Sequence, residues 1–173
     1  PISPVTTFAG GTNWKTVSCS VNENTVAIKT DGTLWVWGWA GKGLLGINNG
    51  SVGYAVYTPV TTILGGTNWK SVSCGDDAIA AIKTDGTLWV WGSNYNGHLG
   101  INKGGDVIAA RSTPVTTFAG GTNWKSVSCA SGHISAIKTD GTLWTWGYNY
   151  NGQLGINLGS DVVAVISTPV TTF

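Results

Sequence analysis

A repeat of 55 residues organises this chain and constrains its fold more than any other feature. Three residue types keep this spacing: Pro4, Pro59, Pro114 and Pro169; Trp14, Trp69 and Trp124; Cys19, Cys74 and Cys129. The segment P-V-T-T-F or P-V-T-T-I occurs four times, whereas the rest of the repeat occurs three times. Such periodicity is typical of folds in which one supersecondary unit is stacked repeatedly.

Each repeat has the pattern of short antiparallel strands. In the third repeat, residues 125–129 alternate polar and apolar, and 133–138 form a second, more apolar run. The dipeptide D-G at 140–141 predicts a two-residue hairpin turn into a third strand, whose Trp residues share one face. The P-V-T-T-F segment predicts a fourth strand, with Pro at its start or at a sheet edge. We therefore predict an all-β fold of β-propeller blades, each with four antiparallel strands, and three blades in this chain.

The third repeat also carries a recognisable motif. Residues 131–147 read S-G-H-I-S-A-I-K-T-D-G-T-L-W-T-W-G, and 148–155 read Y-N-Y-N-G-Q-L-G. This string resembles the regulator of chromosome condensation (RCC) repeat, including its bacterial and viral types, with the signature W-G-x-N-x-x-G-Q-L-G. The second repeat matches at 91–100 with His for Gln, and the first, at 37–46, lacks the Asn. The resemblance implies a β-propeller, typically of seven blades, and leaves the function open because the family includes exchange factors, inhibitors and ligase subunits.

The period places expected boundaries along the chain. We expect blade 1 in residues 1–58, blade 2 in 59–113 and blade 3 in 114–168, with 169–173 as the first strand of a further unit. Propellers close with four to eight blades, so three leave two broad faces without a neighbour. The chain is then a segment of a longer propeller, a protomer that closes a ring with its copies, or a unit of an open assembly. The fourth P-V-T-T-F copy and the absence of Met favour a segment excised from a longer array.

The sequence offers no pattern for catalysis, a cofactor or a metal site. Cys19, Cys74 and Cys129 lack CxxC spacing, so we expect small buried hydrophobes. His98 and His133 occupy different repeat positions, and we expect His133 to be a structural side chain at a strand start. We expect the Asp of each D-G turn to stabilise the local turn geometry. A net charge of +1 argues against a nucleic-acid partner, and no apolar run is long enough for membrane insertion.

Two variable regions are candidate contact surfaces. The loop between the first and second strands predicts a rim loop that carries Glu23, Asp76, Asp77 and His133. The connection from L-G-I-N to the next Pro is apolar in its second half and predicts either an interface or an added outer strand packed on its own blade. Its candidate interface residues are Tyr54, Tyr57, Ile108, Arg111, Val163 and Ile166.

These observations predict a non-catalytic β-propeller module for protein–protein interaction, in a segment of a longer propeller. The expected partner is another protein or copies of the chain itself. The alternative is a structural subunit of an extracellular or virion assembly, completed by self-association, since near-identical units pack alike. Guanine nucleotide exchange is disfavoured because no inserted wedge interrupts the repeats. Low charge favours the extracellular space or a virion surface over the cytoplasm without fixing the location.

Overall fold

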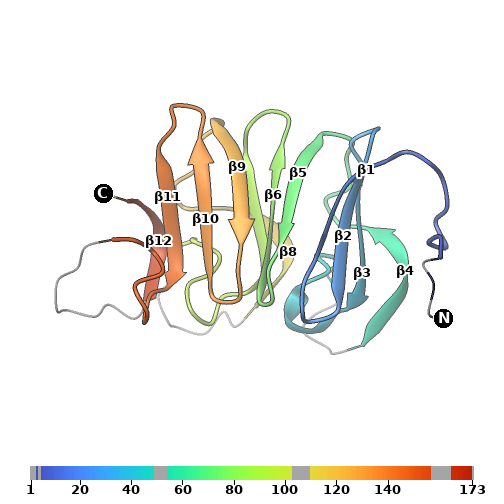
Figure 1. Cartoon of the computed structure of the whole chain (residues 1–173), viewed down its shortest axis with the longest axis horizontal. Helices are drawn as coiled ribbons and strands as arrows, with labels where there is room; N and C mark the ends of the chain where they lie inside the picture. Colours follow the sequence, from blue (N-terminus) through green and yellow to red (C-terminus); the bar gives the residue numbers. More distant parts are fainter. Residues whose placement is uncertain (1–2, 4, 49–53, 103–109, 157–164, 173) are drawn as a thin grey trace.

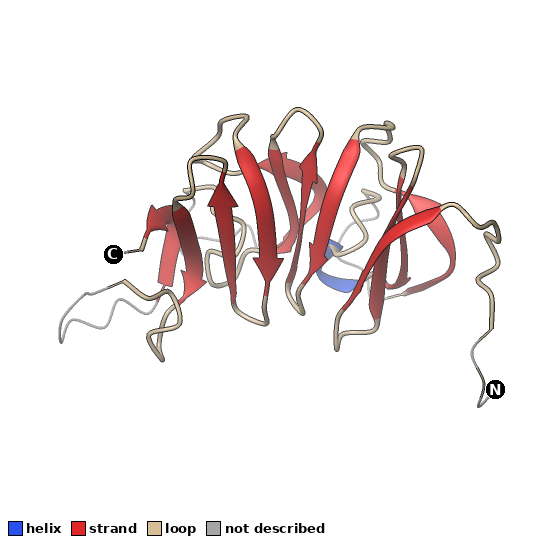
Figure 2. Cartoon of the chain, turned by 45° about the horizontal axis from the view of Figure 1, so that its top comes forward, coloured by secondary structure: helices blue, strands red, loops and turns tan. Residues whose placement is uncertain are grey.

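The computed structural model describes residues 3, 5–48, 54–102, 110–156 and 165–172. In this part of the chain the strands form three four-stranded antiparallel sheets, which lie side by side in sequence order (Figures 1 and 2). The prediction of all-β propeller blades is therefore confirmed. Blade 1 contains β1 (Trp14–Cys19), β2 (Asn24–Lys29), β3 (Leu34–Trp39) and β4 (Ala55–Thr61); blade 2 contains β5 (Trp69–Cys74), β6 (Ala78–Lys83), β7 (Leu88–Ser93) and β8 (Ala110–Thr116); blade 3 contains β9 (Trp124–Cys129), β10 (His133–Lys138), β11 (Leu143–Tyr148) and β12 (Val165–Thr171).

The D-G turns join the second and third strands of each blade as predicted. In blade 1 the Asp31 carboxylate accepts hydrogen bonds from the Thr33 backbone N–H at 2.9 Å and from the Thr33 hydroxyl at 2.7 Å. Asp85 and Asp140 make the same two bonds in the other blades. These bonds lower the pKa of all three carboxyl groups. Their role is therefore local turn geometry.

The P-V-T segment ends a sheet and does not begin one. In blade 1, β4 pairs antiparallel with β3, with Val60 opposite Val36, and it is the outermost strand. The boundaries expected after residues 58, 113 and 168 therefore fall inside β4, β8 and β12. Residues 169–171 belong to the third sheet, paired with β11, and do not start a further unit. The described residues of the first copy, at 4–8, form no strand.

Neighbouring blades share their cores through two different faces. We call the side with the Trp residues of the third strand the Trp face, and the opposite side the Leu face. Val26, Ile28, Leu34 and Val36 on the Leu face of blade 1 pack with Trp69, Ile79, Ala81 and Trp91 on the Trp face of blade 2. Ala80, Ile82, Leu88 and Val90 pack likewise with Trp124, Ile134, Ala136 and Trp146 of blade 3. Each junction therefore buries one Leu face against one Trp face.

Among the described residues, one short helical element lies outside the sheets. The 3-10 turn η1 (Gly41–Gly43) follows β3, and its middle residue Lys42 has a positive φ of 57°. This turn contacts β7 and β8, so it lies at the junction of blades 1 and 2. It positions the Lys42 side chain at the rim.

Candidate functional site

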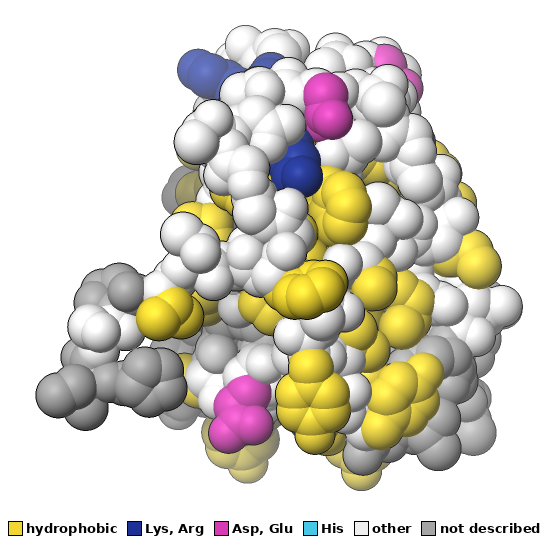
Figure 3. Space-filling model, turned by 90° about the vertical axis from the view of Figure 1, so that its right-hand side faces the viewer, with side chains coloured by type: hydrophobic (Ala, Val, Ile, Leu, Met, Phe, Trp, Pro, Cys, Tyr) yellow, Lys and Arg dark blue, Asp and Glu magenta, His cyan; other side chains and the backbone are white. Residues whose placement is uncertain are grey.

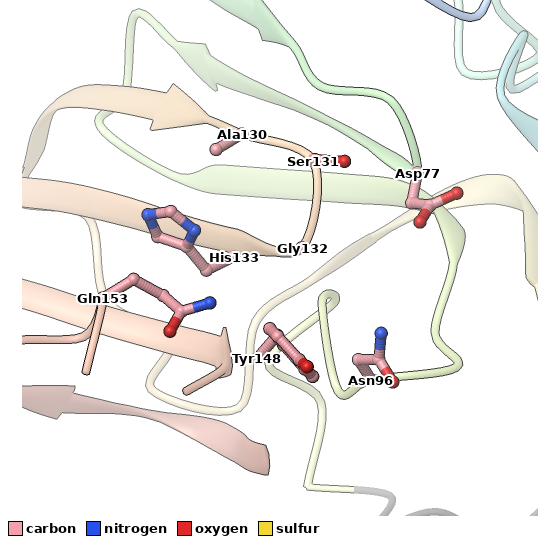
Figure 4. A pocket seen from close by; sticks show the side chains of 8 residues that line it. All are labelled: Asp77, Asn96, Ala130, Ser131, Gly132, His133, Tyr148 and Gln153. Carbon is pink, nitrogen blue, oxygen red and sulfur yellow. The ribbon is translucent and has the colours of Figure 1, made fainter. Parts of the chain in front are cut away.

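A cavity of about 430 Å³, whose lining includes several polar side chains, lies at the rim between blades 2 and 3 (Figure 4). Blade 2 supplies Asp77 from the loop before β6 and Asn96 from the loop after β7. Blade 3 supplies the loop before β10 and side chains that include His133, Tyr148 and Gln153. The cavity therefore forms where loops of two consecutive blades meet on a rigid pair of sheets.

The two acidic residues of the blade 2 loop bind blade 1. Asp77 forms an ion pair with Lys42, with 2.5 Å between Oδ1 and Nζ. Asp76 accepts a hydrogen bond from the Val21 backbone N–H at 3.3 Å, and its own carbonyl accepts one from the Asn22 amide at 2.6 Å. Both residues thus form polar contacts between blade 2 and blade 1, and Asp77 also lines the cavity.

The structure places the four residues of the rim prediction in different surroundings, and their role in contacts stays a prediction. Asp77 and His133 line the same cavity, whereas Asp76 is not among its lining residues. Glu23 lies in a separate hollow beside Val21 and Trp39. His133 stands at the start of β10, as expected.

Two histidines lie at this junction, and burial lowers the pKa of both. His133 is partly buried, so its imidazole is held towards the neutral form. For the buried His98, desolvation is opposed by the negative charge of Asp77 and by the carbonyls of Ser93 and Gly132. Neither ring nitrogen of His98 has a hydrogen-bond partner of normal geometry among the described residues. Of the two, only His133 lines the cavity, where its imidazole lies with the paired carboxylate of Asp77, while His98 is buried.

The rest of the cavity suits polar recognition. The ring of Tyr148 stacks on Tyr150, with 6.0 Å between centroids and 13° between planes. Asn96 and Gln153 add amide donors and acceptors. Among the described residues, no group of three or more His, Cys, Asp or Glu side chains is placed to hold a metal ion. The arrangement can hold a polar or aromatic side chain of a protein ligand.

The candidate interface residues, which belong to the apolar connections, differ from one another in exposure and packing. Tyr57, in β4, is 90% exposed, and Tyr54 is also exposed. Ile166 is half-buried and packs against the core between blades 2 and 3. Arg111 is partly buried in β8, and its Nε has no hydrogen-bond partner among the described residues. Ile108 and Val163 lie outside the described residues.

Among the residues that the structure describes, no second blade packs on the Trp face of blade 1. Figure 3 shows hydrophobic side chains gathered on this end of the molecule. Trp14 and Trp37 are only partly buried, and Val17 is 67% exposed. Cys74 is buried as expected and Cys129 is partly buried, but the expectation is wrong for Cys19, which is exposed because no other blade among the described residues covers it.

Sequence reasoning missed several cavity residues. Tyr148 occupies the position of Trp39 in blade 1 and Ser93 in blade 2. The variation of this position among the three repeats was the sequence signal that could have identified it. Gln153 is the Gln of the repeat signature, and His98 replaces it in blade 2. The sequence alone does not show that loops of two consecutive blades enclose one space.

The chain belongs to the Regulator of chromosome condensation (RCC1) repeat family. The profile of this repeat matches residues 31–82, 85–137 and 140–171, which together cover most of the chain. A second profile of the same repeat matches residues 69–97 and 124–153. The resemblance of the sequence motifs to this family is therefore confirmed.

Relatives and solved structures agree with this assignment. The chain is 32% identical to the ultraviolet-B receptor UVR8 of Arabidopsis thaliana over 84% of this chain and 32% of that protein. It is also 32% identical to the mitochondrial RCC1 domain-containing protein RUG3 of the same plant, over 76% of this chain and 30% of that protein. Prp20p from Saccharomyces cerevisiae superimposes with a TM-score of 0.80 at 21% identity, over 93% of this chain and 38% of that one. The chain thus spans about a third of the length of these proteins.

Yeast RCC1 (Prp20) has been solved bound to Kap60, so a protein of this fold binds another protein. That structure covers 93% of this chain with a TM-score of 0.76 at 20% identity, over 37% of its own length. Among the described residues of this chain, no helix is long and apolar enough to cross a membrane.

Proposed function

We propose that this chain is a non-catalytic propeller module that binds a protein partner through its rim, as part of a longer propeller. The observation that carries the proposal is the cavity between blades 2 and 3, which is built from variable loops on rigid sheets. Its aromatic ring, amides and paired carboxylate offer hydrogen bonds and a stacking surface, which suit a side chain of a protein ligand. The extracellular or virion-surface setting expected from the composition stays a prediction.

The test uses substitutions that another blade of this chain already carries. His133→Ala copies Ala78 of blade 2, and Tyr148→Ser copies Ser93, so both variants are expected to fold. We expect the unaltered chain to capture a stoichiometric protein partner from cells of its source, and the double variant to lose it. Phe118→Lys, at an exposed loop residue outside the cavity, is the control and should retain the partner. Equal capture by all three chains would refute binding at this cavity.

A second candidate function is a structural subunit completed by self-association. The observation that favours it is the partial exposure of Trp14 and Trp37 on blade 1. The equivalent Trp residues of the other two blades are fully buried. Large exposed apolar patches on proteins mark contact sites. Electron microscopy should show regular assemblies of the purified chain if this function holds, and dispersed single particles if it does not.

A further inference from the structure

The blades have a second rim, which lies opposite the cavity. In each antiparallel sheet the loops before the second strand and after the third strand lie at one end, and the D-G turn lies at the other end. Figure 1 shows the turns after β6 and β10 at the top and the loops before these strands at the bottom. The inner strands β1, β5 and β9 begin at the end that carries the D-G turns. We call this end the turn rim and the opposite end the cavity rim.

Each inner strand begins with a β-bulge at a lysine. In blade 2 the register of β5 against β6 shifts between Trp69 and Ser71, so Lys70 has no partner residue on β6. Lys15 in blade 1 and Lys125 in blade 3 are left without a partner residue in the same way. A bulge removes a residue from the regular pairing and redirects its side chain. All three lysines are exposed, and each blade therefore presents one of them at the turn rim.

A second lysine of each blade is held beside the D-G turn. In blade 2 the Lys83 Nζ lies 4.8 Å from the ring centroid of Trp69 and 4.7 Å from that of Trp89. Hydrogen bonds from Thr87, followed by the positive charge of Lys83, lower the pKa of the Asp85 carboxyl group. The equivalent lysines of blades 1 and 3 also lie between two Trp rings and act on the Asp of their own turn. Each turn carboxylate is therefore balanced by a lysine of its own blade.

The three bulge lysines keep a positive charge that no neighbour balances. Among the described residues, none of the three forms an ion pair, and none is among the charges that lower the pKa of the turn Asp residues. The turn rim thus has one excess positive charge on every blade. The cavity rim differs, because its described residues include three acidic side chains and two basic ones: Glu23, Asp76, Asp77, Lys42 and Arg111.

The arrangement of charges on the turn rim favours an acidic segment of a protein over nucleic acid. The inner strand β5 lies against both β1 and β9, so one extended segment can contact the lysines of consecutive blades. The exposed carboxylates of Asp31, Asp85 and Asp140 lie at the same rim. They would repel the closely spaced phosphates of nucleic acid. A peptide can place carboxylates at the lysines and uncharged residues near these Asp side chains.

We propose that the turn rim is a second binding surface, separate from the cavity, and that it binds an acidic, extended segment of a protein partner. Lys15, Lys70 and Lys125 each pair with a carboxylate of that segment. The bulges hold the backbone of each lysine on a rigid sheet, so the spacing of the blades sets the spacing of the charges. Because every blade contributes one equivalent contact, the affinity falls stepwise as the lysines are removed.

The test removes the three charges and measures the binding of a defined acidic probe. Lys15→Gln, Lys70→Gln and Lys125→Gln are combined in one variant, which should fold because all three residues are exposed. Far-UV circular dichroism checks the fold. The probe is a fluorescein-labelled peptide in which Glu alternates with Ser. Its binding is followed by fluorescence anisotropy at low salt, where exposed charges are least screened.

A control variant has the same net charge as the lysine variant. Val21→Glu, Tyr95→Glu and Asn151→Asp add three negative charges at exposed positions of the cavity rim, one in each blade and none lining the cavity. Each triple variant lowers the net charge by three, from +1 to −2. An effect of overall charge weakens peptide binding equally in both variants, whereas a local surface loses affinity in the lysine variant.

We expect the lysine variant to bind the peptide about tenfold more weakly than the unaltered chain, because each exposed charge pair contributes a small share of the affinity. Each single lysine substitution should weaken binding about twofold, and the control variant should lose no more than that. Equal affinity of the two triple variants, or no binding of the peptide by the unaltered chain, would overturn the proposal. The bulge lysines would then only shield the edge of the inner strand from unwanted pairing.

A second probe tests the class of partner. An oligothymidylate with the same number of negative charges as the peptide should bind the unaltered chain more weakly than the peptide does. Tighter binding of the oligothymidylate would overturn the assignment to a protein segment in favour of nucleic acid. Both results are independent of the cavity, because none of the three lysines lines it.

Discussion

Trp37 and Trp91 occupy the same position in two nearly identical blades, yet only Trp91 is fully buried. The indole of Trp91 lies against the Leu face of blade 1 and donates to the Leu44 carbonyl. In the described part of the chain, no other blade lies against Trp37. The difference teaches that a neighbouring blade, and not the local sequence, determines which side chains form the core. The same holds for stacked repeats in general, because each repeat buries its apolar face only against the next.

The largest expected effect comes from truncating these two indoles. Trp91→Ala should lower the free energy of unfolding by about 3–5 kcal/mol, because it removes a fully buried ring and leaves the Leu44 carbonyl without its donor. Trp37→Ala should cost about 1–2 kcal/mol, since part of that ring is already in water. Urea unfolding of dilute protein measures both values. Equal losses would contradict the role given to the neighbouring blade.

The D-G turns provide a second matched pair. Gly86 and Gly141 both have a positive φ, of 80° and 87°. A Cβ at Gly86 would overlap the Thr122 carbonyl of the adjoining segment, whereas nothing lies within 4 Å of one at Gly141. Gly141→Ala should therefore cost about 1–2 kcal/mol for the left-handed backbone alone. Gly86→Ala should cost about 2 kcal/mol more, because the overlap also strains the junction. Thermal unfolding with equal midpoints for both variants would contradict this account.

The smallest expected effect concerns the ion pair at the first junction. Lys42 and Asp77 are 45% and 25% exposed, so Lys42→Ala should cost no more than about 1 kcal/mol. The cost should shrink in 0.5 M salt, because solvent screens exposed charges. Asn96→Ala, at the equivalent position of the second junction, is the control and should show no salt dependence. A salt-independent loss at Lys42 would mean that its contribution is packing.

The repeat made much of the fold predictable. The strands, the Asp side chains in the turns and the separation of Trp and Leu residues onto two faces all follow from local pattern and spacing. The blade boundaries did not follow, since a periodic sequence has no intrinsic starting point. Only the pairing of β4 with β3 shows that Pro59 stands in the last strand of a blade.

The candidate site was predictable only in part. The variable loops indicated Asp77 and His133, and both line the cavity. Tyr148 and Gln153 come from another loop, and His98 lies buried at the same junction. Their proximity depends on how one blade is rotated against the next, which is a tertiary property that no single repeat encodes.

The reactivity of Cys19 tests most directly whether a neighbouring blade, and not the local sequence, determines which side chains are buried. At internal junctions burial raises the pKa of Cys74 and Cys129 to about 12, which suppresses the reactive thiolate. Cys19, at the equivalent position, is exposed. In dilute protein at pH 8 we therefore predict one rapidly alkylated thiol, Cys19, and much slower alkylation of Cys74 and Cys129. Equal alkylation rates for the three thiols would contradict the account.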